Sequence, residues 1–490
     1  MPPDPSKTAV DRWLRGPRLA DDRRRFLAAL LDINCAHVVM LRERGLVASD
    51  AARALLDANE GIRLDPGRLD AHPEREDLYF TVEAAIAISA GEEAGGQLHI
   101  GRSRNDITAT MTRMVVRDDD ARLGRLLLDV IRALVTLAAG HARTLMPGYT
   151  HLRPGQPTTF GHYLTGVAWA LRRDYQRLAD GRGRADECPM GAAAFAGTGF
   201  DIDRERIAAL LGFARPVPHT QDAVASRDSV LELLAGLALT ASTLARWIED
   251  WYVWSTLEFG FLLLDPAIAG GSSIMPQKQN PNALERTRAK AGHVAAALLD
   301  ALFATKGTGF THAQDISVES VAPFWVAAGE MEAMLDVSCQ LVRCVRVNSA
   351  RMRERATSGF TMATEITDEL VRTRRVPFRA AHGIVARAVR ETADGDQPGL
   401  LARLNAVGAE LGRPLQVTEA EIHGWMDPEA AIARRHSGGP SPEEVARLLG
   451  DLRQWIQTAE DELEQIRRRL AAAVAAREQA VRCILAGAEA

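Results

Sequence analysis

A polar stretch at residues 270–285, GGSSIMPQKQNPNALE, carries the residue types that acid–base chemistry on an anionic substrate requires. The pair Gly270 and Gly271 permits a mobile loop, and the hydroxyl, ammonium and amide groups that follow could close over an anion. We expect Pro281 to open a helix that carries Glu285. The alternative is a plain surface connection, in which so specific a polar cluster would be accidental.

A second stretch, HIGRSRNDITAT at residues 99–110, concentrates Ser103, Arg104 and Asn105 just before a helical pattern. A guanidinium can hold a carboxylate through two parallel hydrogen bonds, and Asn and Ser add directed donors. The same composition is typical of a helix N-cap. These residues alone leave carboxylate binding and helix capping both open.

A third stretch, MPGYTHLRPGQPT at residues 146–158, places His151 between two Pro-Gly pairs and away from any apolar stripe. A histidine in a rigid loop can act as an acid or a base. A lone histidine is more often structural, so this stretch by itself also leaves two roles open.

Long helices are the elements that must position these stretches. Apolar residues recur at helical spacing from Leu123 to Leu137, and a second stripe runs from Val230 to Trp251. Trp247, Trp251 and Trp254 share that spacing, which favours core packing. Residues 283–306 and 451–487 read as further helices, and alternating strand patterns are nearly absent. The sequence therefore predicts an all-α fold.

The composition is that of an ordinary soluble protein, with 490 residues, 47% hydrophobic, 25% charged and a net charge of −5. This balance favours neither nucleic acid nor an anionic membrane surface as a partner. The five cysteines are scattered and form no CxxC pair, which indicates reduced thiols. The N-terminus has no signal-peptide pattern, and charges interrupt the apolar runs short of a membrane span. We therefore expect a cytoplasmic protein.

The polar breaks suggest three domains. We expect an N-terminal helical lobe at residues 1–105, a central long-helix domain with the polar loop at 106–355, and a C-terminal helical lobe at 356–490. Wide apolar stripes on soluble helices need partners, so we also expect a homo-oligomer whose subunits share a helix bundle.

Seven motifs together resemble a known family. GSSIMPQKQNP resembles the signature of the aspartase/fumarase superfamily. The other motifs, which resemble argininosuccinate lyase, are LHIGRSRND, MPGYTHLRPGQP, AFAGTGFDIDRERIAALLGF, QDAVASRD, VPFRAAHGIVARAV and ARRHSGG. They occur in that family's order across about residues 30–450, so the resemblance covers nearly the whole chain.

The resemblance implies cleavage of a C–N bond in an N-succinyl compound, with release of fumarate. The hard step removes a proton beside a carboxylate, and the intermediate then needs positive charge and hydrogen-bond donors around it. By motif position, Ser272 is implied as the base, Lys278 as the fixed cation, and His151 as a leaving-group proton carrier oriented by Glu285. The residues implied to bind substrate are Ser103, Arg104, Asn105, Thr150, Ser273, Met275, Asn280 and His312.

The resemblance also implies an assembly. Family members are homotetramers in which long central helices form a shared bundle, and each active site takes its motifs from three subunits. The implied partner is a small-molecule substrate, and no metal or organic cofactor is implied.

The amine-handling segments depart from the family pattern. Argininosuccinate-cleaving members carry a stretch like TYNRDLQEDKE, whose Tyr, Gln and Lys contact the arginine part of the substrate. Here residues 311–321 read THAQDISVESV, which puts His312, Ser317 and Ser320 at those places. The family's N-terminal SIxFDxRL-like segment is also missing, and residues 18–28 read RLADDRRRFLA instead.

Each lost hydrogen bond to a charged group removes roughly 1.5–3 kcal/mol, so three losses together lower argininosuccinate affinity steeply. The sequence therefore favours a lyase for another N-substituted aspartate, similar to ethylenediamine-disuccinate lyase. The alternatives are an argininosuccinate lyase with compensating contacts and a catalytically inactive, crystallin-like structural member. The amine, the physiological direction and a contact of His312 with substrate all stay open.

Overall fold

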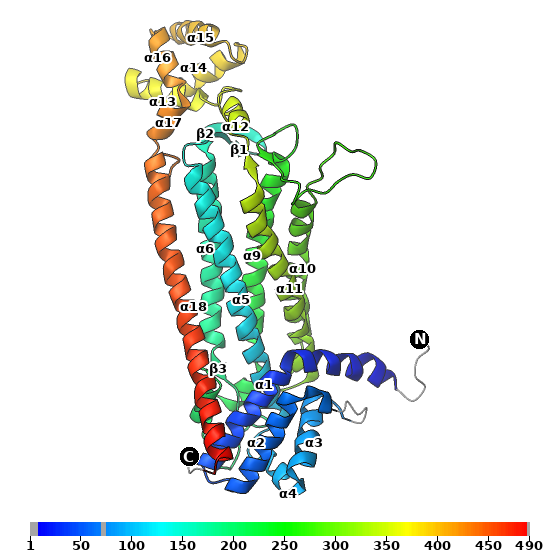
Figure 1. Ribbon diagram of the computed structural model, residues 1–490. Helices are drawn as coiled ribbons and strands as arrows, with labels where there is room; N and C mark the ends of the chain where they lie inside the picture. Colours follow the sequence, from blue (N-terminus) through cyan, green and yellow to red (C-terminus); the bar gives the residue numbers. More distant parts are fainter. Residues whose placement is uncertain (1–7, 70–74, 488–490) are drawn as a thin grey trace.

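Five long helices run side by side and form the centre of the computed structural model, which describes residues 8–69 and 75–487 (Figure 1). Within this bundle α5 packs on α6, α6 on α9, α9 on α10, and α10 on α11. The bounds are α5 (Arg104–Gly140), α6 (Phe160–Ala185), α9 (Asp228–Trp254), α10 (Asn282–Thr305) and α11 (Ala322–Cys344). The predicted all-α fold and the predicted helix after Pro281 are confirmed.

The apolar stripe of α9 is the core of this bundle. Val230, Leu234, Leu244 and Trp251 are at most 1% exposed, and Trp247 packs edge-to-face on Trp251 with ring centroids 5.0 Å apart. By length and composition alone, α9 is the one described helix that could cross a membrane, and half of its most apolar window is buried inside the molecule. Its apolar character follows from packing against α6, α10 and α11.

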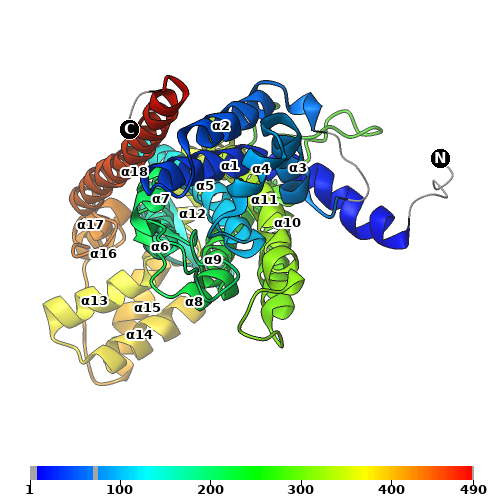
Figure 2. The same cartoon turned by 90° about the horizontal axis from the view of Figure 1, so that it is seen from below.

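The N-terminal helices cover the lower end of the bundle, as the view from below shows (Figure 2). They are η1 (Asp11–Arg15), α1 (Gly16–Glu43), α2 (Ser49–Leu64), η2 (Pro66–Arg68), α3 (Leu78–Ala90), α4 (Glu92–Gly95) and η3 (Gly96–His99). Part of the N-terminal stretch that lacks a signal-peptide pattern, residues 1–7, lies outside the described residues. All five cysteines are free.

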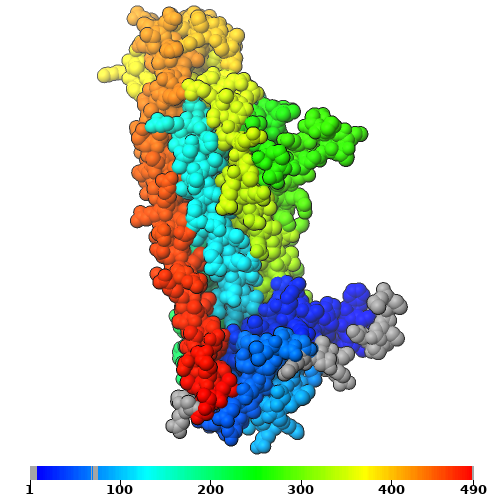
Figure 3. Space-filling model, in the orientation of Figure 1, coloured from blue at the N-terminus to red at the C-terminus, as the bar shows by residue number. Residues whose placement is uncertain are grey.

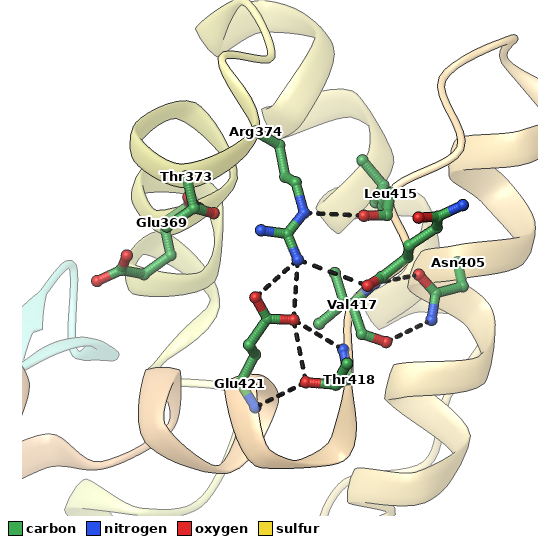
Figure 4. A network of polar contacts seen from close by, with 9 residues as sticks. Glu369, Thr373, Arg374, Asn405, Leu415, Val417, Thr418 and Glu421 are labelled. Atoms are coloured by element: carbon green, nitrogen blue, oxygen red, sulfur yellow. Dashed lines mark hydrogen bonds and ion pairs between the residues drawn. The ribbon is translucent and has the colours of Figure 1, made fainter.

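The C-terminal lobe lies at the opposite end of the bundle (Figure 1). Its helices are α13 (Ala363–Arg374), α14 (Phe378–Arg390), α15 (Gln397–Glu410), α16 (Glu419–Trp425) and α17 (Pro428–Ala433). Arg374 joins three of its segments, because its guanidinium donates to the Leu415 carbonyl at 2.9 Å and to Glu421 at 2.7 and 2.8 Å (Figure 4). Glu421 also accepts from the Thr418 amide in a capping box, which fixes the start of α16.

The last helix, α18 (Pro442–Leu485), returns along the bundle from the C-terminal lobe to the N-terminal helices (Figures 1 and 3). It starts at the N-cap Ser441, whose hydroxyl accepts from the Glu444 amide. The division into residues 1–105, 106–355 and 356–490 remains a prediction.

One polar break differs from its predicted form. Residues 146–158 are predicted to be a loop, but β1 (Leu145–Thr150) and β2 (Arg153–Thr159) pair as an antiparallel hairpin. The Pro and Gly residues obscure the strand pattern in the sequence, because they occur rarely in strand interiors. The other described strands are short pairs: β3 (Glu187–Cys188) with β4 (Arg215–Pro216), and β5 (Leu262–Leu263) with β6 (Arg346–Val347). The remaining short helices are α7 (Arg204–Leu210), α8 (Thr220–Ala225), η4 (Asp315–Glu319) and α12 (Ser349–Ala356).

Candidate active site

The first group of expected site residues opens α5. Ser103 is the N-cap and forms a capping box with Asp106, so the capping role left open by the sequence is present. The buried Asp106 carboxylate accepts from the amides of Ser103, Gly191 and Ala193 at 2.8–3.0 Å. Burial raises the pKa of Asp106 to about 6, although these hydrogen bonds oppose the shift. This carboxylate therefore ties the loop at residues 191–193 to the start of α5.

Arg104 is paired within its own chain. Its Nη1 lies 3.1 Å from Oδ2 of Asp77 and 3.0 Å from Oε2 of Glu76, and its guanidinium lies 5.1 Å from the Phe80 ring centroid. Asn105 Nδ2 donates to the Ala194 carbonyl at 3.0 Å. A substrate carboxylate at Arg104 would compete with these two side-chain carboxylates.

His312 belongs to the same end of the molecule. Burial and the positive charges of Arg227, Arg104 and Arg18 lower the pKa of His312 to about 4, and its buried Nδ1 has no hydrogen-bond partner among the described residues. The imidazole is therefore neutral at pH 7. Arg18 Nη1 donates to Gln314 Oε1 at 2.9 Å, which joins the two segments that depart from the family pattern, residues 18–28 and 311–321.

A cavity of about 500 Å³ lies between α1, α3, α5, η4 and α11 at this end. Four carboxylates and one guanidinium line it, those of Asp21, Asp22, Asp77, Glu319 and Arg18. Phe26 and Trp325 form an aromatic wall, with ring centroids 5.8 Å apart. The lining is therefore acidic by count and partly apolar. Asp21, Asp22 and Asp77 each pair with an arginine, which leaves Glu319 as the cavity carboxylate without an ion pair among the described residues.

The second group lies on the polar loop between α9 and α10, which projects from the upper part of the molecule (Figures 1 and 3). Backbone hydrogen bonds between Gly270 and Asn280, at 2.7 and 2.8 Å, close the base of the loop. The Ser272 hydroxyl accepts from the amides of Ile274 and Met275. Asn280 Nδ2 donates to the Gly271 carbonyl at 3.1 Å.

The charged and hydroxyl groups of this loop face solvent. Ser273, Met275 and Lys278 are exposed, and Ser272 is partly exposed. No described side chain accepts a hydrogen bond from the Ser272 hydroxyl. Within one chain, the loop therefore presents Ser272 as a candidate base and Lys278 as a cation, but no other expected site residue lies beside them.

The third group lies at the tip of the β1–β2 hairpin. Thr150 is the last residue of β1, and His151 and Leu152 form the turn with φ of 56° each. Two consecutive positive φ values match a type I′ turn, which normally selects Asn and Gly. His151 therefore holds a left-handed conformation that is uncommon for residues with a Cβ, a feature that clusters at functional sites. Its side chain is exposed.

Glu285 lies in the first turn of α10, where its Oε1 accepts from the Tyr252 hydroxyl at 3.4 Å. Among the described residues no hydrogen bond joins it to His151. The expected His151–Glu285 pair is thus not formed within one chain.

The group that opens α5 lies at the lower end of the bundle, whereas the polar loop and the hairpin lie at the upper end (Figure 1). The 37 residues of α5 separate Arg104 from the hairpin, which at 1.5 Å per residue is about 55 Å. The part of α10 that follows Glu285 ends at Thr305 and separates Glu285 from the segment of His312 by about 30 Å. A small substrate cannot touch all three groups in one chain.

Arg227 is a residue that the sequence analysis did not single out. It lies in QDAVASRD, is 4% exposed, and donates Nη1 to the carbonyls of Val224 and Ser226. Its Nε and Nη2 have no partner among the described residues, and burial and the charge of Arg113 lower its pKa to about 10. The QDAVASRD motif could have drawn attention to Arg227. Its burial near His312 could not have been predicted, because it depends on how distant segments of the chain pack together.

The described residues hold no group of three or more His, Cys, Asp or Glu side chains arranged to bind a metal ion. The chemistry available in this arrangement is proton transfer and anion binding by hydroxyl, amide, ammonium and guanidinium groups.

Comparison with known proteins identifies the family. A family model described as lyase matches residues 18–296, and one described as argininosuccinate lyase C-terminal matches residues 360–433. Argininosuccinate lyase 1 of Shouchella clausii is 36% identical over 96% of this chain and 95% of its own length. Argininosuccinate lyase of Methanoculleus marisnigri is 38% identical over 90% and 93%.

Among solved structures, a variant of EDDS lyase with bound fumarate superposes with a TM-score of 0.87 at 31% identity, over 94% of this chain and 92% of that one. The motifs, the all-α bundle and these relatives agree on the type of enzyme. The chain belongs to the argininosuccinate lyase family of the aspartase/fumarase superfamily and is a carbon–nitrogen lyase that forms fumarate.

Proposed function

We propose that the protein cleaves an N-substituted aspartate by β-elimination to fumarate and a free amine other than arginine, or runs the reverse addition. The carrying observation is the acidic cavity between residues 18–28 and 311–321. The succinyl half of the substrate would bind to the residues at the start of α5, on the polar loop and at the hairpin tip. The amine half would enter this cavity.

The proposed chemistry needs a base, a cation and donors. Ser272 would remove the proton beside the carboxylate, and Lys278 would stabilise the charge that develops. Ser273, Met275 and Asn280 would bind the same carboxylate from the loop, while Ser103, Arg104, Asn105 and Thr150 would hold the remaining substrate oxygens. The exposed, Gly-hinged loop supports closure over the substrate, which would exclude water from the reacting groups.

We further infer a homotetramer in which different subunits supply the three groups. The separation of about 55 Å along α5 between the Arg104 group and the hairpin supports this arrangement. Exposed apolar side chains on α9, α10 and α11 supply a surface for it, namely Leu239, Leu299, Leu302, Phe303 and Val326, each at least 43% exposed. In such an assembly His151 and Glu285 of different subunits would meet.

The lining of the cavity favours an amine that carries a second positive charge on a short apolar chain. Asp21, Asp22 and Asp77 are each paired with an arginine. The carboxylate that suits a substrate cation is therefore that of Glu319, and Phe26 and Trp325 suit methylene groups. Glu319 is exposed and forms no ion pair among the described residues. A diamine fits these features.

Arginine would also bring a carboxylate into the cavity, and the cavity offers no free positive charge to bind it among the described residues. The family's Lys position is Ser320, which is fully buried and donates its hydroxyl to the Ile316 carbonyl at 2.8 Å. His312 is neutral at pH 7 because its pKa is lowered to about 4. Arg18 pairs with Asp22 at 3.1 Å. His312 would therefore contact the amine half as a neutral group.

A panel of N-succinyl amines, followed by the absorbance of fumarate, tests the proposal. The expected kcat/KM is highest for an aspartate N-substituted with an aminoalkyl chain and at least a hundredfold lower for argininosuccinate. Glu319→Gln should lower kcat/KM for the aminoalkyl-substituted aspartate about tenfold, since it removes one charged contact. Efficient turnover of argininosuccinate with the aminoalkyl compounds inert would refute the proposal.

Argininosuccinate lyase activity is the second candidate, because the curated relatives named above carry that name at 36–38% identity. Restoration of arginine-independent growth in a strain that lacks the activity would favour it.

A further inference from the structure

The motif ARRHSGG, residues 433–439, lies where the chain passes from α17 to α18. At this point the C-terminal lobe meets the β1–β2 hairpin at the upper end of the bundle (Figure 1). The proposed chemistry assigns this motif no role, yet its contacts reach the strand that follows the His151 turn.

Arg435 joins two elements. Its Nη1 donates to the Pro157 carbonyl in β2 at 2.9 Å, and its Nη2 pairs with Oε2 of Glu365 in α13 at 3.3 Å. Glu365 is 4% exposed, so this carboxylate is a fixed anchor inside the C-terminal lobe. Arg435 thereby ties the hairpin to that lobe.

A second contact from the same motif supports the first. The Gly438 carbonyl lies 3.0 Å from Nε2 of His162, and Nδ1 of His162 lies 3.1 Å from the Thr158 hydroxyl. The carbonyl can only accept, so Nε2 of His162 carries a proton and donates to it. The end of β2 is thus held from both sides.

The hairpin needs such support. Pro147, Pro154 and Pro157 have no amide hydrogen to donate, and the strand register shifts between Pro147 and Tyr149. His151 and Leu152 adopt positive φ values, which are unfavourable for residues with a Cβ. A weakly bonded ladder that holds an unfavourable turn depends on contacts outside the hairpin.

We propose that Arg435 is a positioning residue that fixes β2 against the C-terminal lobe and so orients His151 at the hairpin tip. The inference rests on the proposed role of His151. It assigns the C-terminal lobe a part in catalysis without any contact to substrate.

Arg434 provides a matched control. Its guanidinium pairs with the same Glu365, at 2.5 Å, and with Glu369, at 3.4 Å, both in α13. Within the described residues it forms no hydrogen bond or ion pair with the hairpin. Arg434→Met and Arg435→Met each remove one guanidinium from Glu365. Only the second removes the hydrogen bond to Pro157.

The test measures Tm, kcat, KM and the pH profile of both variants and of His151→Asn. Both Arg variants should lose a similar few degrees in Tm. Arg435→Met should lower kcat at least tenfold and shift the pH profile, with KM within threefold, whereas Arg434→Met should keep kcat within twofold. Arg435→Lys, which retains a charge beside Glu365 and reaches one acceptor, should recover part of kcat.

Equal kcat losses in the two Met variants, or none in Arg435→Met, would overturn the inference. If Arg435→Met does not fold, the same comparison between Arg435→Lys and Arg434→Lys decides. His151→Asn separates the two proposals: wild-type kcat in that variant refutes the role of His151, whereas a loss there without a loss at Arg435 refutes only the positioning role.

Discussion

The guanidinium of Arg104 and the carboxylate of Asp77 form an ion pair, with Nη1 and Oδ2 3.1 Å apart. The arginine expected to hold a substrate carboxylate is therefore occupied by an internal one before substrate arrives. Asp77 also caps α3 by accepting from the Phe80 amide at 3.1 Å. Substrate binding would exchange one carboxylate for another at Arg104.

Asp77→Asn should therefore tighten fumarate binding. The amide oxygen keeps the cap, while the charge that competes for Arg104 is removed. A partly exposed ion pair contributes roughly 0.2–1 kcal/mol, so the Kd for fumarate, measured by calorimetry, should fall up to about fivefold. Arg104→Gln is the control and should abolish binding. Weaker binding by Asp77→Asn would contradict the exchange.

Gly270→Ala should impair the loop. A Cβ at this position would lie 2.0 Å from Nδ2 of Asn282, so one of the two must move. We expect kcat to fall about tenfold with Tm unchanged, and the double variant Gly270→Ala/Asn282→Ala to recover most of it. Gly271→Ala meets no atom within 4 Å and serves as the control. If kcat stays low in the double variant, the clash with Asn282 is not the cause of the loss.

His312 should make stability depend on pH. The unfolded chain protonates this imidazole below its ordinary pKa of 6.5, whereas the folded chain does so only near 4. The unfolded state therefore binds more protons in this window, and the free energy of unfolding falls as the pH drops from 6.5 to 4.

Urea unfolding at pH 7 and pH 5 measures this contribution. His312→Gln should lose less stability between the two pH values than wild type, by about 1 kcal/mol or less after allowance for solvent screening. Identical losses in the two proteins would mean that His312 titrates alike in the folded and unfolded states.

Phe303→Asp should split the proposed tetramer. Phe303 is 66% exposed on α10 beside other exposed apolar residues, and a carboxylate there would be buried unpaired in a subunit interface. Light scattering should show a smaller species without activity. Ile88→Asp, at a residue 77% exposed on α3, should leave mass and activity unchanged. A fully active monomer would refute the shared sites.

The helical part of the fold could be predicted because its signal is periodic and local. The stripe from Val230 to Trp251 and the helix after Pro281 both appear as predicted. The hairpin around His151 could not, because its Pro and Gly residues resemble a loop and its strand register shifts between Pro147 and Tyr149, which residue types alone do not reveal.

The site was less predictable than the fold. The motif residues could be found by resemblance, but Arg227, Asp77 and the acidic cavity depend on segments brought together from distant parts of the chain. The cap role of Ser103 could be anticipated from residue types, whereas the pairing of Arg104 with Glu76 could not.

The most direct test of the account mixes two inactive variants, Arg104→Gln and Ser272→Ala, after unfolding and joint refolding. If Arg104 and Ser272 of different subunits form each site, random assembly leaves both residues intact in about a quarter of the sites. We predict that each variant alone is inactive and that the mixture recovers about a quarter of wild-type fumarate release. No recovery in a correctly assembled mixture, or activity in either variant alone, would contradict the account.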